Sequence, residues 1–131
     1  MIGLDTNVLL RYLTQDDPQQ ASVATRAIQD GANTGETFFI SSPVLCELVW
    51  VLDAAYGHDR DEIAEILEQV LRTRQFVFED KDLLWQALSD YREQRGDFSD
   101  YLIGRRGREA GCDRTLTFDR KLRGSPHFSV L

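Results

Sequence analysis

The feature that most constrains the fold of this 131-residue chain is an alternation of short apolar runs with longer segments of helical spacing. The runs are Ile2–Leu4, Thr37–Ile40, Phe76–Phe78, Arg114–Phe118 and Phe128–Leu131. Their aromatic and β-branched residues favour short strands, and the first reads as a buried strand. Strands that alternate with helices are typical of a parallel sheet covered on both faces. We therefore predict an α/β fold, a three-layer α/β/α sandwich with a central, mostly parallel sheet, in a single domain of residues 1–131.

Helix-start residues follow or precede most of these runs. Asp, Ser and Pro at such positions favour N-caps and first helical turns. The expected helices begin after Asp5, at Pro18, at Ser41-Ser42-Pro43, after Asp59, at Asp80 and at Asp97-Phe98-Ser99-Asp100. The last strand, Phe128–Leu131, is expected at an edge of the sheet.

Charge is spread unevenly along the chain, whose formal net charge is −7. Residues 1–91 hold 6 Lys/Arg against 16 Asp/Glu, a balance of −10, whereas residues 92–123 hold 9 against 6, a balance of +3. An acidic protein is a poor nonspecific binder of nucleic acid. The segment from Arg92 to Arg123 offers a local basic surface for phosphates. The alternative is that Arg105, Arg106 and Arg108 form a solvated helix face.

Compartment and membrane association follow from other residues. No charged segment followed by an apolar one indicates a secretory signal. The most apolar stretch, Phe38–Leu52, is too short for a membrane span and carries Glu47. Cys46 and Cys112 lack the spacing of a metal site, so we expect both to be reduced, small core residues. These observations predict a cytoplasmic protein without membrane association.

Several acidic residues occur at corresponding places in this scheme. Asp5 ends the first strand, Glu47 lies in the first turns of the helix after the second, Asp100 begins the helix before the fourth, and Asp119 follows that strand. Asp97, one helical turn before Asp100, is a fifth candidate. Parallel strands would place all of them at one end of the sheet, where their charges repel unless a cation lies among them. Oxygen ligands favour Mg²⁺ or Mn²⁺.

Each acid also has a purely structural interpretation. Asp5, Asp97 and Asp100 are suitable helix caps, and Asp119 is suitable in a turn. Glu47 is flanked by Leu45, Cys46, Leu48 and Val49, and a charged residue in apolar surroundings is usually paired or bound to a metal. His58 and His127 are isolated, which argues against zinc and favours surface or packing roles.

Four motifs in this order resemble those of the PIN-domain nucleases, and among them the VapC-type toxins. The matching pieces are Ile2–Leu9 (IGLDTNVL), Ile40–Leu48 (ISSPVLCEL), Asp97–Ile103 (DFSDYLI) and Thr115–Asp119 (TLTFD). The resemblance implies a metal-dependent endoribonuclease. In that scheme the catalytic residues are Asp5, Glu47, Asp100 and Asp119; the metal ligands are the same four with Asp97; and the positioning residues are Thr6, Asn7 and Thr117.

The resemblance also implies partners and a mechanism. RNA would be the substrate, and the chain would form a homodimer. A VapB-like antitoxin would inhibit it by placing one of its own helices in a groove of the chain and directing a basic side chain into the acidic pocket. Water would attack the phosphodiester with the help of one or two Mg²⁺ ions, while an Arg steadies the phosphate. One departure is Gly104, where the family more often has Ala, and we expect only a slightly weaker helix there.

Three alternatives remain from the residues alone. A phosphoacceptor signalling module is also α/β with acids at strand ends, but it needs an Asp after the middle strand and a late Lys. Here the third strand is followed by Glu79-Asp80-Lys81-Asp82, and the late Arg120 and Lys121 follow an acid. A PIN-like nuclease of RNA processing or DNA, and a binding module without catalysis, are the other two.

Overall fold

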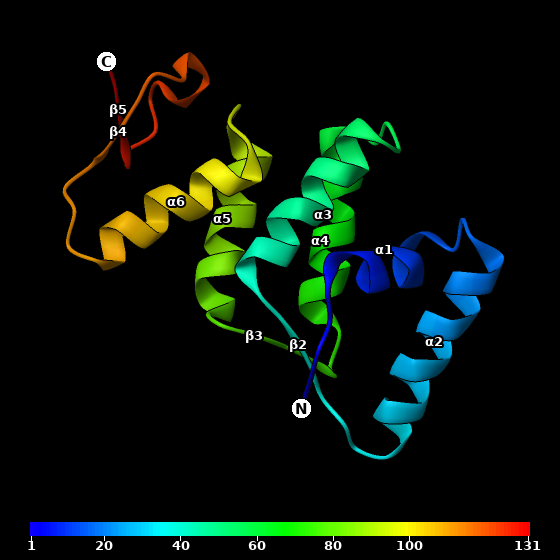
Figure 1. Ribbon diagram of the computed structural model, residues 1–131. Coiled ribbons are helices and arrows are strands. Elements are labelled where there is room, and N and C mark those ends of the chain that lie inside the picture. Colours follow the sequence, from blue (N-terminus) through cyan, green and yellow to red (C-terminus); the bar gives the residue numbers. More distant parts are fainter. The chain divides into compact units, whose positions relative to one another are not determined.

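The computed structural model describes residues 1–131, and its contacts group them into two compact units. Unit 1 comprises Met1–Gly57 and Val70–Glu79, and unit 2 comprises His58–Gln69 and Asp80–Leu131. Figure 1 labels the elements along the chain.

Unit 1 is built on a parallel three-stranded sheet of order β1-β2-β3. Its elements are β1 (Ile2–Gly3), α1 (Thr6–Thr14), α2 (Pro18–Asn33), β2 (Phe38–Ile40), α3 (Ser42–Ala54) and β3 (Phe76–Phe78). In the register, Ile2 faces Phe38, which in turn faces Phe76. Helices between parallel strands give the α/β class that the alternating pattern predicts.

The first two helices of unit 1 are capped by the acids that precede them. Asp5 accepts a hydrogen bond from Val8 N at 3.1 Å, and Asp17 accepts one from Gln20 N at 3.0 Å. Each carboxylate satisfies a backbone N–H that the first helical turn leaves unpaired. Local sequence therefore sets where α1 and α2 begin.

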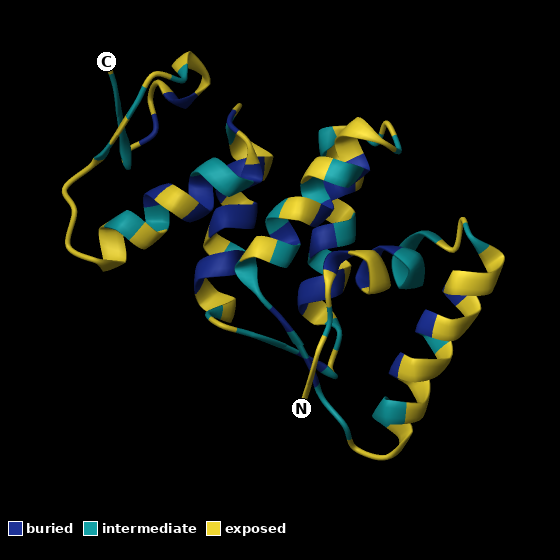
Figure 2. Cartoon of the chain, in the orientation of Figure 1, coloured by how far each residue is buried: buried dark blue, intermediate teal, exposed yellow.

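The core of unit 1 is aliphatic. It contains Leu9, Ile28, Ile40, Leu45, Leu48 and Leu52, none of which is measurably exposed. At its margin the ring of Tyr12 packs edge-on against Phe76, with centroids 6.2 Å apart. Figure 2 shows α2 buried along only one side, which matches its buried residues Ala21, Ala24 and Ile28.

The first strand is less buried than its sequence suggests. We predicted a buried strand, but Ile2 is 50% exposed and Gly3 is also exposed. The reason lies in the topology of unit 1, because β1 is hydrogen-bonded to β2 alone and lies at the edge of this sheet. An apolar run by itself does not distinguish an edge strand from a central one.

Unit 2 combines three helices with a pair of parallel strands. Its elements are α4 (Arg60–Arg72, whose last residues belong to unit 1), α5 (Lys81–Glu93), α6 (Phe98–Glu109), β4 (Thr115–Thr117), the 3-10 helix η1 (Arg120–Leu122) and β5 (Phe128–Val130). Thr115 faces Phe128 in the ladder, and Thr117 faces Val130. Phe128–Val130 thus forms the expected final strand.

Charged side chains hold the helices of unit 2 together. The Arg105 guanidinium donates two hydrogen bonds to Asp90, at 2.7 and 2.8 Å, and joins α6 to α5. Arg60 covers the ring of Tyr91 at 4.0 Å and donates to its carbonyl oxygen at 2.6 Å. Asp90 is buried, so its carboxylate depends on Arg105 for compensation.

Gly104 has a packing role that we did not expect. A Cβ atom at this position would lie 2.6 Å from Phe128 Cε2 and 3.2 Å from His127 Cβ. The missing side chain therefore leaves room for β5 against α6. Our expectation that Gly104 affects only helix strength was wrong, because helix propensity says nothing of what packs on the helix.

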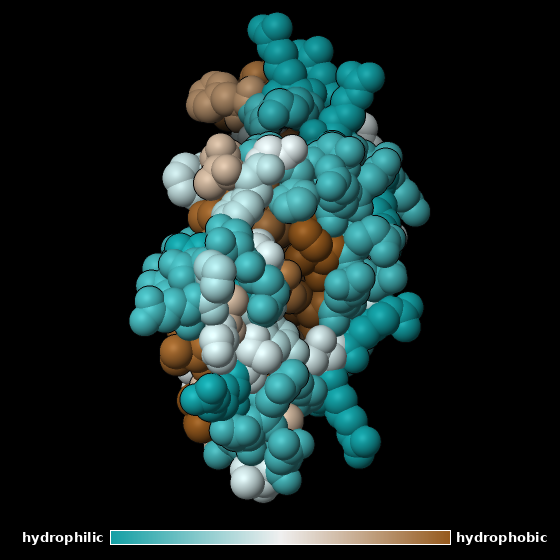
Figure 3. Space-filling view, turned by 90° about the vertical axis from the view of Figure 1, so that its right-hand side faces the viewer, coloured by the Kyte–Doolittle hydropathy of each residue, from teal (hydrophilic) through white to brown (hydrophobic).

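None of the helices is both long and apolar enough to cross a membrane. The surface seen in Figure 3 is mostly hydrophilic, with apolar side chains in a few patches. The large apolar residues left most exposed include Met1, Val23, Trp50, Phe118 and Leu131.

Candidate active site

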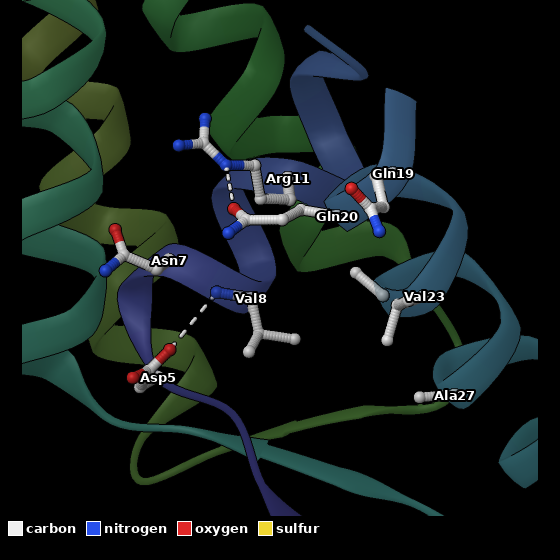
Figure 4. A pocket seen from close by; sticks show the side chains of 9 residues that line it. Asp5, Asn7, Val8, Arg11, Gln19, Gln20, Val23 and Ala27 are labelled. Atoms are coloured by element: carbon white, nitrogen blue, oxygen red, sulfur yellow. Dashed lines mark hydrogen bonds between the residues drawn. The ribbon is translucent and has the colours of Figure 1, made fainter. Parts of the chain in front are cut away.

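Asp5 lies at the junction of β1 and α1, as its motif predicts. Leu4 N donates to Phe39 O at 2.9 Å, which aligns the end of the strand, and Asp5 follows with φ −88° and ψ 173°. Figure 4 shows its carboxylate capping Val8 N. The capping hydrogen bond engages Oδ1, and a carboxylate has two oxygens, so capping and ligand binding are compatible.

The two polar residues after Asp5 differ in exposure. Thr6 is buried, whereas Asn7 is exposed and lines a pocket together with Asp5. An exposed amide beside a carboxylate supplies both a hydrogen-bond donor and an acceptor to a bound molecule.

Glu47 lies on the exposed side of α3, contrary to what its apolar neighbours suggest. The buried residues of this helix are Leu45, Leu48 and Leu52. Each residue of an α-helix is turned about 100° from the last, so the flanking residues face other directions. Glu47 therefore does not lie in the apolar surroundings from which we inferred that it is paired or bound to a metal, and its role as a ligand stays a prediction.

Asp97 and Asp100 lie together at the start of α6. Asp97 is the N-cap, and its backbone N–H donates to Asp100 Oδ2 at 3.0 Å. Asp100 is half-buried and Asp97 is exposed. The structural interpretation of these acids as helix-capping residues is confirmed, and it fixes where both carboxylates lie.

Asp119 begins a tight turn after β4. Its backbone N–H donates to Thr117 Oγ1 at 3.0 Å, and its Oδ1 accepts from Lys121 N at 2.9 Å. These two bonds hold the Thr117 hydroxyl and the Asp119 carboxylate on one short segment of unit 2.

Asp97, Asp100 and Asp119 influence one another electrostatically. The pKa of Asp100 is raised by burial of its carboxyl and by the charges of Asp97 and Asp119; the Asp97 N–H and the Lys121 ammonium oppose that rise. The charges of Asp97 and Asp119 therefore act on the Asp100 carboxyl, and whether the three acids share a cation stays a prediction. Lys121 also acts on Asp100, and we did not predict it as a site residue. Its position two residues after Asp119 could have indicated that it lies near these acids.

The candidate ligands lie in both units. Asp5, Thr6, Asn7 and Glu47 belong to unit 1, whereas Asp97, Asp100, Thr117 and Asp119 belong to unit 2. Neither unit gathers three or more His, Cys, Asp or Glu side chains into a group able to hold a metal ion. A metal site shared by all five acids therefore stays a prediction.

Other residues with possible chemistry have structural explanations. His58 Nδ1 lies 3.2 Å from Glu62 Oε2, and His127 packs beside Gly104. Both cysteines are free, as expected, and burial raises the pKa of the half-buried Cys46 thiol. Cys112 is exposed, so its assignment to the core was wrong.

The basic segment divides between structure and surface. Arg105 is committed to Asp90, and that hydrogen bond raises the pKa of its guanidinium. Arg106 and Arg108 are exposed on α6. The solvated-face interpretation therefore fails for Arg105, and the other two keep both interpretations.

A pocket of about 670 Å³ lies between α1 and α2, within unit 1. Figure 4 shows Asp5 and Asn7 at one end, Arg11 and Gln20 at the other, and Val8 and Val23 facing its middle. Arg11 Nε donates to Gln20 Oε1 at 2.8 Å across the helix pair. Sequence reasoning missed this pocket because its sides come from separate helices.

Comparison with known proteins agrees with the motifs. The PIN-domain family profile matches residues 2–124. This chain belongs to the PIN-domain family. The PIN domain is also similar to a VapC ribonuclease of Aquifex aeolicus (strain VF5), with 28% identity over 120 residues that cover 92% of this chain and 88% of that relative. The predicted resemblance to VapC-type proteins is confirmed, and with it the PIN-like α/β/α fold.

Proposed function

We propose that this PIN domain is a metal-dependent endoribonuclease and the toxin of a type II toxin–antitoxin pair. The observation that carries this proposal is the PIN-domain match over residues 2–124, a range that includes Asp5, Glu47, Asp100 and Asp119. The similarity to a VapC ribonuclease supports RNA as the substrate.

The donor set fits a hard divalent ion. The candidate ligands Asp5, Glu47, Asp97, Asp100 and Asp119 offer only carboxylate oxygens, which suit Mg²⁺ or Mn²⁺. Such an ion, when bound, supplies positive charge that lowers the pKa of water and stabilises the negative charge on phosphate.

The side chains themselves divide the remaining work. In this proposal Asp5, Glu47, Asp100 and Asp119, with Asp97 as a fifth ligand, would hold the ion, and one of these carboxylates would accept the proton of the attacking water. Thr6, Asn7 and Thr117 orient water or phosphate through their hydroxyl and amide groups. Capping hydrogen bonds already fix the carboxylates of Asp5 and Asp100, so these two side chains would lose less conformational entropy on binding a metal ion.

Single amide variants test the acid set. Asp5→Asn, Glu47→Gln, Asp100→Asn and Asp119→Asn keep side-chain size and are each expected to lower RNA cleavage at least about 100-fold, the scale for losing a transition-state electrostatic contact. Asp80→Asn is the matched control, because Asp80 caps α5 through Leu83 N at 3.1 Å but is outside the set. Mn²⁺ titration calorimetry reports metal binding separately. Full cleavage by Asp5→Asn with unchanged metal affinity would remove Asp5 from this role.

We propose that the pocket between α1 and α2 binds a helix of a VapB-like antitoxin. Its apolar middle suits the apolar face of a helix, and Asp5 at one end attracts a basic side chain. Val23→Glu places a charge in that middle, where Val23 is 66% exposed. We expect this variant to escape inhibition by the antitoxin while it cleaves RNA normally. Inhibition that is wholly insensitive to saturating Mg²⁺ would exclude competition at Asp5.

The toxin role and assembly need tests of their own. We propose a homodimeric, cytoplasmic protein in which residues 1–131 act as a single nuclease domain. Light scattering at several concentrations measures the oligomer. Growth arrest on expression without the neighbouring reading frame, with a mapped RNA cut, supports a toxin; cleavage without arrest favours a PIN nuclease of RNA processing.

A further inference from the structure

The residue that leads into β5 holds an imidazole in unusual surroundings. His127 Nδ1 is buried, and it is the only buried side-chain nitrogen or oxygen of the chain without a hydrogen-bond partner. A Cβ atom at Gly104 would lie 3.2 Å from His127 Cβ, so the residue packs closely against α6. Most buried polar side-chain atoms in folded proteins have a partner, so this exception needs an explanation.

The charges around His127 come from α6 and α5. Burial lowers the pKa of the His127 imidazole, and the guanidinium groups of Arg105 and Arg108 on α6 lower it further, whereas Asp90 on α5 opposes them. The Asp90 carboxylate already accepts two hydrogen bonds from Arg105. The neighbouring strand β4 carries no charged residue. No uncommitted carboxylate among these groups is available to pair with an imidazolium.

Protonation changes what this position requires. A neutral imidazole has one donor and one acceptor nitrogen, whereas both nitrogens of the imidazolium are donors. With a proton on both nitrogens, Nδ1 is a buried donor without an acceptor on a charged ring, which costs more than a buried neutral nitrogen. The protonated ring therefore favours a position in which Nδ1 reaches water.

We propose that His127 is a pH-sensitive contact whose protonation moves its ring off α6 and loosens the pairing of β5 with β4. The backbone of His127 is part of that pairing, because its carbonyl oxygen accepts a hydrogen bond from Thr115 N at 2.8 Å. At the other end of the ladder Leu131 N donates to Thr117 O at 2.9 Å, two residues before Asp119. Acid would thus free the segment that carries Thr117 and Asp119.

The sign of the effect follows from the direction of the shift. Because the pKa of His127 lies below its ordinary value of 6.5 in the folded state, its contribution to stability is complete above that pH and is lost as the pH falls. Asp100 acts in the opposite direction, since its pKa is raised. The measure is therefore the difference between the unmodified protein and a variant that lacks only the His127 imidazole.

Thermal unfolding at about pH 7.5 and pH 5.5 tests the proposal. For a chain of this length, proton binding that is tenfold weaker in the folded state lowers Tm by up to about 5 °C on acidification. We expect His127→Gln, which stays neutral, to lose less Tm between these two pH values than the unmodified protein. His58→Gln is the matched control, because Nδ1 of the other histidine already lies 3.2 Å from Glu62 Oε2. It should not show the smaller acid loss expected of His127→Gln.

NMR of the unmodified protein keeps the test decisive even if His127→Gln does not fold. The His127 ring signals should titrate below pH 6.5, and hydrogen-exchange protection of the Thr115 and Leu131 amides should fall through the same transition. Titration of His127 at or above pH 6.5 overturns the inference. So does amide protection that is unchanged while the ring titrates, or an equal acid loss of Tm in the unmodified protein and His127→Gln. None of these measurements involves RNA, so their failure leaves the proposed function untouched.

Discussion

Substitution of Gly104 by Ala opposes two effects of known sign. Ala is favoured over Gly inside a helix by about 1 kcal/mol, so propensity alone predicts stabilisation. The added Cβ, however, would lie 2.6 and 2.8 Å from two carbons of the Phe128 ring. Overpacking of this kind costs about 1–3 kcal/mol. The steric overlap should therefore outweigh the gain in helix propensity, and the free energy of unfolding should fall by about 1 kcal/mol.

Thermal unfolding measures this balance. At about 2.1 cal/mol/K per residue, a chain of this length loses about 4 °C of Tm per kcal/mol, so Gly104→Ala should unfold about 4 °C lower. Propensity alone would raise Tm by about the same amount, so the sign decides.

A second substitution isolates the cause. Phe128→Leu removes the ring edge that a Cβ at 104 would meet, so Gly104→Ala added to it should be neutral or stabilising. Higher Tm for the single variant, or an equal loss in both backgrounds, would refute the packing argument. RNA cleavage by the same variants would report whether the shift reaches Asp100, one turn earlier on α6.

Three further predictions concern charged groups. Asp100→Asn should raise the Tm measured in EDTA at neutral pH. The pKa of Asp100 is higher in the folded than in the unfolded state, so stability is lost as the pH rises through that pKa, and the neutral amide removes this loss. Any Tm gain that Mg²⁺ gives the unmodified protein should be absent in the variant, and calorimetry with and without metal checks both outcomes. Arg105→Gln should lower stability by about 3 kcal/mol, because Asp90 then keeps a buried, unpaired charge; urea unfolding is the measurement, and a change below about 1 kcal/mol contradicts it. Tyr56→Phe should raise the pKa of Asp16 from about 2, since the Tyr56 hydroxyl is its first hydrogen-bond donor, as an NMR titration will show; an unchanged value would assign the shift to Thr14 and Arg11.

Element boundaries were predictable because their signals are local. Asp5, Asp17 and Asp80 each cap the helix that follows, and the caps engage backbone groups three residues away. The strand at Phe76–Phe78 was located correctly for a similar reason, since its composition differs from that of both flanking segments.

Side-chain surroundings were less predictable because they depend on distant residues. Glu47 has apolar neighbours in sequence yet lies on the exposed side of α3, and the partner of Asp90 is 15 residues away. The room taken by Phe128 beside Gly104 likewise has no local signal. The candidate acids were found by motif and by position at element ends, and whether they share a cation requires the variants above.

The cap at Asp5 restricts what this position tolerates. Its short side chain reaches Val8 N from the residue where β1 gives way to α1. Glutamate has the same charge but one more methylene. Its carboxylate would therefore either move from the position that the Asp5 carboxylate occupies or lose the hydrogen bond to Val8 N. A carboxylate alone is therefore insufficient at this position, because both the length and the charge of the side chain matter. Asp5→Glu is expected to lose activity through a misplaced carboxylate, whereas Asp5→Asn loses the charge.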